Sequence, residues 1–262
     1  MMAESLLAES PLKVWSGRGG RLLRLRLSRP KANLIDADMI AALNKALTEH
    51  QADTGLLAVL LDHEGPHFSF GASVEEHLPG QCADMLRTIH ALVIRLLDYP
   101  VPVMVAISGQ CLGGGLELAL SGHLIFAAPG AMLGQPEIKL AVFAPAASCL
   151  LAERIGRARA EDLLFSGRSV GAEEGLRMGL VNAIDEDPEA AALAYFDEHL
   201  SGLSASSLRY AVSAARLGFT DRVKAKLEEA EALYLGGLMD TSDAVEGLEA
   251  FIEKRPAVWE HR

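Results

Sequence analysis

Hydrophobic and polar residues alternate strictly in the segment Leu22–Ser28. Leu23, Leu25 and Leu27 share one side of the chain, and the positions between them hold arginine. This two-residue period is typical of a strand with one buried face. Pro30 follows closely and cannot continue a ladder of backbone hydrogen bonds, so we expect a half-buried strand that ends before it.

Other segments show different patterns. Leu56–Leu61 and Val101–Ile107 are apolar without interruption, which predicts strands that are buried on both faces. Between them, Cys82–Leu97 has apolar residues at helical spacing. It is predicted to be an amphipathic helix, in which His90 has a structural role.

Strands and helices alternate through the first half of the chain. After the first strand, Asp36 or Asp38 is placed to cap a helix that runs to about His50. The apolar run His123–Ala128 predicts a further strand. Such alternation of β and α elements indicates an α/β fold.

The second half is predicted to be mostly helical. Three further segments have the periodicity of helices: Leu203–Leu217, Arg222–Leu238 and Ser242–Glu253. We therefore predict a core domain of residues 1–195 and a C-terminal helical region of residues 196–262.

Composition limits the possible partners. The chain has 262 residues, of which 50% are hydrophobic and 23% are charged, as expected for a globular protein with a sizeable core. Its formal net charge of −11 argues against nucleic acid or an anionic membrane as the main partner. The uncharged stretch Tyr99–Leu116 contains prolines and glycines, so a membrane-spanning helix is not expected there.

Cysteine usage and the N-terminal residues bear on localisation. The three cysteines show no C-x-x-C spacing, so neither a disulfide framework nor a zinc site is expected. The first fifteen residues have no basic segment ahead of an apolar run, which predicts that they are not a secretory signal. Both observations favour a cytoplasmic protein.

The candidate chemistry lies between residues 110 and 145. A glycine triplet, Gly113–Gly115, precedes a short apolar helix that carries Glu117, and Glu137 follows after a strand and a turn. Glycines at a helix start expose backbone N–H groups to a ligand, as an oxyanion site requires. Two carboxylates beside such donors suit acid–base chemistry on a carbonyl compound. On spacing alone, both glutamates being solvated is the alternative.

Four stretches together resemble a known family: LSRPKANLIDADMIAAL, HFSFGASVEEHL, GGGLELA with LGQPEIKL, and DAVEGLEAFIEKRPAVW. They are similar, in this order, to the crotonase (enoyl-CoA hydratase/isomerase) superfamily, over nearly the whole chain. The resemblance implies a crotonase fold, a spiral of ββα repeats with a C-terminal helical trimerisation region. Within the superfamily, FSFGASVEEH and KLAVFAPAAS most resemble hydratases of cyclohexa-1,5-diene-1-carbonyl-CoA.

The resemblance also implies roles for particular residues. The backbone N–H groups of Phe70 and Gly114 would form the oxyanion hole for the thioester oxygen. Glu117 and Glu137 would share one water and act as base and acid. Phe143 would shape the acyl pocket. The implied substrate is an unsaturated acyl-CoA, to which water is added.

Further residues are implied to bind the substrate or its coenzyme A part. Lys31 and Ala32 would border the adenine end of the pocket, although a basic loop at a strand end explains them equally well. The other implied contacts are Ser69, Gly71, Ala72, Ser73 and Gly113. Most relatives have aspartate where this chain has Ser73, which puts the fine contacts in doubt. No metal and no separate cofactor are expected, because coenzyme A belongs to the substrate.

Two charged segments have simpler interpretations. Glu75, Glu76 and His77 are expected to be a solvated helix start, with acids near the positive end of the helix dipole. Phe251 and the basic residues after it either face a nucleotide or form a solvated basic helix end, and the second is favoured.

Several alternatives stay open. The C-terminal helices either cover a neighbouring subunit in a homo-oligomer, a trimer or a dimer of trimers, or form a lid on the chain's own core. The reaction is hydration of a cyclic dienoyl-CoA, hydration of a straight-chain 2-enoyl-CoA, or another crotonase chemistry such as ring-opening hydrolysis. A fourth possibility is a non-catalytic acyl-CoA-binding protein.

Overall fold

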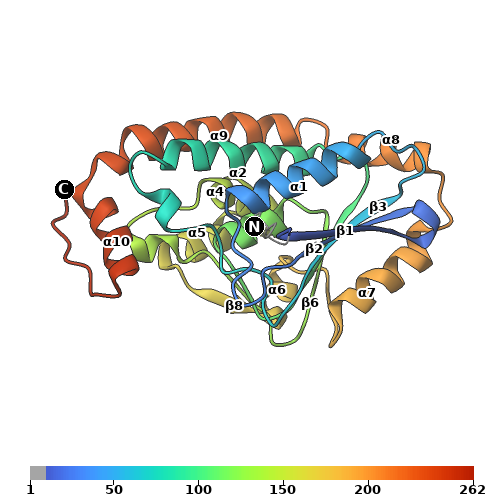
Figure 1. Cartoon of the computed structure of the whole chain (residues 1–262), viewed down its shortest axis with the longest axis horizontal. Helices are drawn as coiled ribbons and strands as arrows, with labels where there is room; N and C mark the ends of the chain where they lie inside the picture. Colours follow the sequence, from blue (N-terminus) through green and yellow to red (C-terminus); the bar gives the residue numbers. More distant parts are fainter. Residues whose placement is uncertain (1–9) are drawn as a thin grey trace, which may run out of the picture.

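A computed structural model describes residues 10–262 of the chain (Figure 1). Most of the segment considered above as a secretory signal lies outside the described residues. The strands form two sheets, one of six strands and one of three. Helices surround both, so the α/β class predicted from the alternating pattern is confirmed.

The large sheet has the strand order β1-β2-β3-β4-β6-β9. Its first two strands form an antiparallel hairpin, and every later neighbour is parallel. The strands are β1 (Leu12–Gly17), β2 (Leu22–Leu27), β3 (Ala58–His63), β4 (Val103–Ile107), β6 (Leu124–Ala127) and β9 (Ala183–Ile184). β3 and β4 are buried along most of their length, as their continuous apolar runs predicted.

The prediction that β2 is half-buried is wrong, because both of its faces are covered. Arg24, on the face expected to be solvated, is only 6% exposed. Arg24 and Arg26 both donate to Asp62 on β3 and to Glu189 of α7 (Pro188–Tyr195). The covering segment lies more than 160 residues away in sequence, so the local alternation carried no sign of it.

Figure 1 shows α1 (Ala37–His50), α2 (Cys82–Leu97) and α9 (Phe219–Gly236) stacked on one side of the large sheet, with α7 on the other side. The Asp36 side chain accepts a hydrogen bond from the Met39 N–H and caps α1, as predicted. The bounds of α2 are those that the periodicity predicted.

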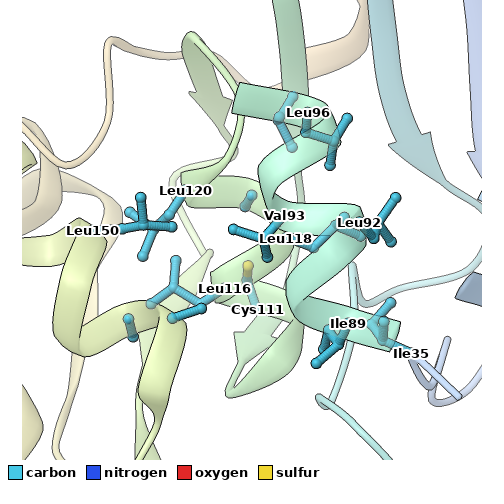
Figure 2. Packing of buried hydrophobic residues seen from close by; sticks show 14 of the residues in the cluster. Ile35, Ile89, Leu92, Val93, Leu96, Cys111, Leu116, Leu118, Leu120 and Leu150 are labelled. Atoms are coloured by element: carbon cyan, nitrogen blue, oxygen red, sulfur yellow. The ribbon is translucent and has the colours of Figure 1, made fainter. Parts of the chain in front are cut away.

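The main core lies beneath this helical layer. Figure 2 shows part of it, where Leu92 and Val93 of α2 lie near Leu116 and Leu118 of α3 (Gly114–Leu120), with Leu150 from α4 (Pro145–Ile155) beside them. The packing is close, because a Cβ atom added at Gly114 would lie 3.3 Å from Cδ1 of Ile89. This core fixes α3, the helix that carries Glu117.

The small sheet, β5-β7-β8, holds the segments on either side of α3. Its strands are β5 (Gln110–Leu112), β7 (Met132–Gly134) and β8 (Ser169–Gly171). β5 is parallel to β7, and a bridge joins Ser69 to Cys111. Since the glycine triplet follows β5 directly and Glu137 follows β7, the parallel pairing brings them to one edge of the sheet.

The remaining elements are short 3-10 and π segments and the later helices. They are η1 (Arg18–Gly20), η2 (Glu75–His77), η3 (Pro136–Leu140), α5 (Arg157–Ser166), α6 (Ala172–Met178), η4 (Phe196–Leu200), α8 (Ala205–Ala215), η5 (Leu238–Asp240) and α10 (Ser242–Glu253). The bounds of α10 match the prediction, and α8 and α9 lie within two or three residues of theirs.

The C-terminal helices join the same core as the rest of the chain. Leu227, Tyr234 and Leu248 are buried members of the main hydrophobic cluster. The boundary between residues 195 and 196 stays a prediction, although side chains on both of its sides pack into one core. Across residues 10–262, no helix is long and apolar enough to cross a membrane.

Candidate active site

A cavity of about 660 Å³ opens beside the start of α3. Eight of the predicted site residues line it: Phe70, Gly71, Ala72, Gly113, Gly114, Glu117, Glu137 and Phe143. Most of the remaining wall is apolar and comes from six segments: Leu34, Val74, Met85, Leu86, Ile89, Leu112, Leu140, Val142, Leu248 and Phe251. An apolar pocket with two convergent carboxyl groups is the arrangement expected of an active site.

The glycine triplet is required by the close approach of its neighbours. Gly113 has φ of 53°, and a Cβ atom there would lie 2.5 Å from Oε1 of Glu137. A Cβ atom at Gly115 would lie 2.6 Å from that of Ser69. Both distances are too short for any other residue, so glycine alone allows Glu137 and the Ser69 loop to reach α3.

The structure contradicts the assignment of Phe70 as an oxyanion donor. Its N–H already donates to the backbone oxygen of Ala32, at 2.9 Å. Its neighbour Ser69 is also engaged, because its N–H donates to the oxygen of Gln110. These bonds attach the loop to β5 and to the Lys31–Ala32 segment, and they leave the Phe70 N–H unavailable to a ligand.

Ala72 replaces Phe70 in this position. Among residues 10–262 its N–H has no hydrogen-bond partner, and neither has the N–H of Gly114 in the first turn of α3. The two groups are neighbours, since a Cβ atom at Gly114 would lie 3.1 Å from the nitrogen of Ala72. Two adjacent free donors on a cavity wall are the geometry of an oxyanion hole.

Glu117 is held in the wall of the cavity by the N-terminus of α4. The side chain is 5% exposed, and Oε1 accepts a hydrogen bond from the Ala147 N–H at 2.8 Å. Burial raises the pKa of Glu117, and the Ala147 N–H and the nearby His90 offset only part of this rise. These two contacts favour the ionised form of Glu117.

Glu137 lies on the opposite side of the glycine triplet, in η3. Burial raises the pKa of Glu137 to about 8, and the negative charge of Glu117 adds to this effect. With its amide oriented to satisfy its hydrogen bonds, Gln135 donates to both carboxyl oxygens of Glu137, at 3.0 and 3.1 Å, which opposes part of this rise. With a pKa of about 8, Glu137 holds a proton at neutral pH.

Comparisons with known proteins agree with this arrangement. Residues 18–262 match the model of the enoyl-CoA hydratase/isomerase family. The chain belongs to this family. It is 65% identical over 255 residues to the cyclohexa-1,5-dienecarbonyl-CoA hydratase of Thauera aromatica, covering 97% of this chain and 99% of that protein. It is 33% identical to a probable enoyl-CoA hydratase of Bacillus subtilis, covering 88% of this chain and 92% of the other.

Solved structures in this family have the same fold. An enoyl-CoA hydratase of Mycobacterium avium subsp. paratuberculosis matches with a TM-score of 0.83 at 22% identity, over 95% of this chain and 98% of that one. An enoyl-CoA hydratase of Bacillus halodurans matches with a TM-score of 0.85 at 20% identity, over 92% and 100%. The crotonase fold implied by the four sequence stretches is therefore confirmed.

Four of the predicted binding residues do not line the cavity of this family member. Ser69 is buried, and its Oγ donates to the backbone oxygen of Asn33, so it shapes the loop. The Ser73 hydroxyl donates to Glu75 at 2.9 Å. Lys31 and Ala32 lie beside the loop, to which Ala32 is joined by its bond from Phe70. A role of these two residues in binding coenzyme A stays a prediction.

The structure adds residues to the site that the sequence reasoning assigned elsewhere. Glu75 and His77, expected to be a solvated helix start, line the cavity, and Nδ1 of His77 lies 2.7 Å from the Ser73 oxygen. Phe251 of α10 also faces the cavity, whereas Arg255 pairs with Glu246. Periodicity predicts that α10 has an apolar face, but it does not show which distant segment this face packs against. Sequence reasoning therefore could not assign Phe251 to the cavity wall.

Side chains that could hold a metal ion are dispersed among residues 10–262. The described part of the chain contains no group of three or more His, Cys, Asp or Glu side chains arranged to hold a metal ion. All three cysteines are buried and unpaired, and burial raises the pKa of the Cys82 and Cys149 thiols to about 11. The expectation that the enzyme uses no separate cofactor stays a prediction.

Proposed function

We propose that this protein is a hydratase that adds water to cyclohexa-1,5-diene-1-carbonyl-CoA, giving 6-hydroxycyclohex-1-ene-1-carbonyl-CoA. The observation that carries the proposal is the Glu117–Glu137 pair, which lines an apolar cavity together with Ala72 and Gly114, whose N–H groups are free. The choice of substrate rests on the 65% identity to the Thauera aromatica hydratase.

The thioester oxygen binds between the two free N–H groups. When water attacks the carbon β to the thioester carbonyl, the electrons of the C=C bond move toward this oxygen and produce a dienolate. Donors fixed at that position stabilise the charge as it develops, and the loss of one typically costs about 3 kcal/mol in the activation free energy. The positive end of the α3 dipole lies at the glycine triplet and adds to this stabilisation, although α3 is a short helix.

The two carboxyl groups divide the proton transfers. Ionised Glu117 takes a proton from water as the oxygen bonds to the β carbon. Protonated Glu137 then gives its proton to the far end of the dienolate. Each group is held in the required form by its own contacts, the Ala147 N–H at Glu117 and enclosure beside a like charge at Glu137.

The cyclic substrate requires a 1,4-addition rather than addition to adjacent atoms. The hydroxyl group bonds at the β carbon and the proton bonds at the other end of the diene, on the opposite side of the ring. Acid and base must therefore reach opposite edges of the ring. Glu117 on α3 and Glu137 on η3 come from different elements on either side of the glycine triplet, as this chemistry needs.

One turnover leaves the pair in the wrong state for the next. The proton taken from water is on Glu117, and Glu137 is ionised. Transfer of that proton from Glu117 to Glu137 through a water molecule restores the starting state, with no net gain or loss of protons. Water must therefore be in contact with the pair before each cycle.

Hydration of a straight-chain 2-enoyl-CoA is the second candidate. It is favoured by the 33% identity to the probable enoyl-CoA hydratase of Bacillus subtilis, and it would use the same pair. A non-catalytic acyl-CoA-binding protein is less compatible with the site, because burying two carboxyl groups together costs stability that binding alone does not require.

A side-by-side rate assay tests the proposal. The purified protein is given cyclohexa-1,5-diene-1-carbonyl-CoA and crotonyl-CoA, and the products are identified by mass spectrometry and NMR. We expect turnover of the diene to the 6-hydroxy-1-ene product and slow or no hydration of crotonyl-CoA. Fast hydration of crotonyl-CoA alone would favour the second candidate. A thermal shift with acyl-CoA but no turnover of either would contradict the enzyme assignment.

We also propose a homo-oligomer, a trimer or a dimer of trimers, in the cytoplasm. Leu248 and Phe251 of α10 line the chain's own cavity, which supports the alternative of a lid on its own core. Large apolar side chains are exposed on α8 (Tyr210) and just after it (Leu217), where a second copy would cover them. Sedimentation analysis distinguishes a monomer from these assemblies.

A further inference from the structure

The most unusual polar atom near the active site is the hydroxyl of Tyr234 on α9. The side chain is 0% exposed, and its hydroxyl has no hydrogen-bond partner within residues 10–262. The ring packs against Phe143, a residue of the cavity wall, with 5.2 Å between centroids. A buried hydroxyl that lacks a partner costs stability, so its presence requires an explanation.

His90 on α2 provides a second atom of this kind. It is 5% exposed, and its Nδ1 lies 2.6 Å from Oε2 of Glu231. A carboxylate only accepts hydrogen bonds, so Nδ1 carries the proton and Glu231 fixes the ring orientation. The other ring nitrogen, Nε2, is buried and has no partner in the described chain.

Both residues lie beside side chains of the cavity wall, because Tyr234 packs against Phe143 and His90 follows Ile89 in α2. α2 packs against α9, and Glu231 and Tyr234 are three residues apart on α9, so they share one face of that helix. Burial is the largest cause of the raised pKa of Tyr234, and the charges of Cys82, Glu137 and Glu117 add to it. Burial likewise raises the pKa of Glu117, and His90 opposes that rise.

The reaction needs water at this place. The acyl cavity is mainly apolar. In the proposed reaction, the substrate ring would occupy the space in front of the carboxyl groups. Water is the second substrate, and by the mechanism above it also carries the proton from Glu117 back to Glu137. Buried polar atoms without a protein partner are where ordered water binds in protein interiors.

We infer that α2 and α9 form a polar wall behind the active site, in which the Tyr234 hydroxyl and Nε2 of His90 hold buried water in contact with the Glu117–Glu137 pair. The inference rests on the proposed hydration. Tyr234 and His90 are positioning residues that act through this water, and Glu231 orients His90.

Tyr234→Phe tests the hydroxyl with a clear difference in sign. We expect kcat to fall about tenfold or more, an effect similar to that of removing a residue that orients the ligands of a metal site. KM should stay within about twofold of the wild-type value. The melting temperature should be equal to that of the wild type or lower. If the hydroxyl is merely an unpaired atom, its removal raises the melting temperature and leaves kcat unchanged, which would overturn the inference.

Tyr99→Phe is the matched control. Tyr99 is also buried, at 1% exposure, but its hydroxyl donates to the backbone oxygen of Leu47 at 3.2 Å, away from the cavity. We expect this variant to have a lower melting temperature and an unchanged kcat. The comparison separates loss of a structural hydrogen bond from loss of the water that serves the carboxyl pair.

Two replacements of His90 separate the roles of its nitrogens. Gln places its amide near the position of Nε2, whereas Asn places its amide near Nδ1 and keeps the bond to Glu231. We expect His90→Gln to retain more of kcat than His90→Asn. The reverse order would assign His90 a purely structural role through Glu231 and would overturn its part in the wall.

A crystal structure of the unmodified enzyme tests the wall independently of the substrate. We expect ordered water within hydrogen-bond distance of the Tyr234 hydroxyl and of Nε2 of His90, connected to Glu117 or Glu137. A dry site would overturn the inference even if the diene is hydrated. If the water is present but the diene is not turned over, the choice of substrate fails and the wall stands.

Discussion

Two sets of buried charges in this protein are built on opposite principles. Between the large sheet and α7, the guanidinium groups of Arg24 and Arg26 face the carboxylates of Asp62 and Glu189, so each charge has a partner of opposite sign. In the cavity, Glu117 and Glu137 place two like charges together; burial raises the pKa of both, and the charge of Glu117 adds to the rise at Glu137.

The difference separates a structural role from a functional one. Paired charges of opposite sign join two elements of the fold, and they hold no proton that a reaction could use. Two enclosed carboxyl groups destabilise the folded state whenever both ionise, so one keeps a proton that it can donate. The first region is expected to govern stability and the second to govern catalysis, and each prediction below tests that division.

The largest effect is expected from removing one carboxylate of the cavity pair. Glu117→Gln and Glu137→Gln should each lower kcat by about 10²–10⁴-fold, the usual contribution of acid–base catalysis. Binding of the acyl-CoA, measured by thermal shift, should persist, because the apolar walls and the free N–H groups are unchanged. Near-normal hydration by either variant would contradict the two-glutamate mechanism.

In the compensated network, the effect should fall on stability instead. Asp62 is 2% exposed and bonds to both arginines, so Asp62→Asn should lower the free energy of unfolding by about 3–5 kcal/mol. Urea denaturation measures the change, and kcat of the folded protein should be unaltered. Glu189→Gln, at the more exposed end, is the control and should cost less.

Gly113→Ala should reduce activity about 10²-fold, because its Cβ atom would meet Oε1 of Glu137 at 2.5 Å and displace the carboxyl group. Gly130→Ala is the matched control, since a Cβ atom there meets nothing within 4 Å. Steady-state rates of the two variants settle the point. Equal activity would show that the glycine triplet does not control the position of Glu137.

The pH dependence is the smallest of these effects near neutrality. The pKa of Glu137 is raised to about 8, and its protonated form is the acid, so kcat/KM should fall as the pH rises through about 8. A profile without this basic limb in the wild type would contradict the assignment of Glu137 as the acid.

The same titration should appear in stability with a defined sign. The folded state holds the Glu137 proton above the ordinary carboxyl pKa of 4.5, where the unfolded chain has lost it. Its contribution is therefore complete at acid pH and is lost as the pH rises through about 8. As the pH rises through about 8, the melting temperature of Glu137→Gln should therefore fall less than that of the wild type.

Local patterns predicted much of this molecule. The bounds of α2 and α10 follow from their periodicity. The glycine triplet and its spacing to Glu137 allowed either a carboxyl pair or two solvated glutamates, and the resemblance to the family favoured the pair. These features depend on residues close together in sequence, or on a motif such as the glycine triplet, which has no room for a side chain.

Features that depend on distant segments were missed. β2 is buried on both faces because α7 covers it, and no residue near β2 indicates this. The free N–H belongs to Ala72 and not to Phe70 because the Phe70 N–H donates to Ala32, a partner 38 residues earlier. His77 reaches the cavity for the same kind of reason, since only the fold places its short helix at the wall.

The central claim is that Glu137 holds the proton and Glu117 the charge. Infrared spectra of the purified protein, titrated from about pH 6 to about pH 10, test it most directly. The account predicts a protonated-carboxyl band that disappears with a midpoint near 8, is absent in Glu137→Gln, and persists at the acid end in Glu117→Gln. A band that is lost in Glu117→Gln and kept in Glu137→Gln would reverse the roles and contradict the mechanism.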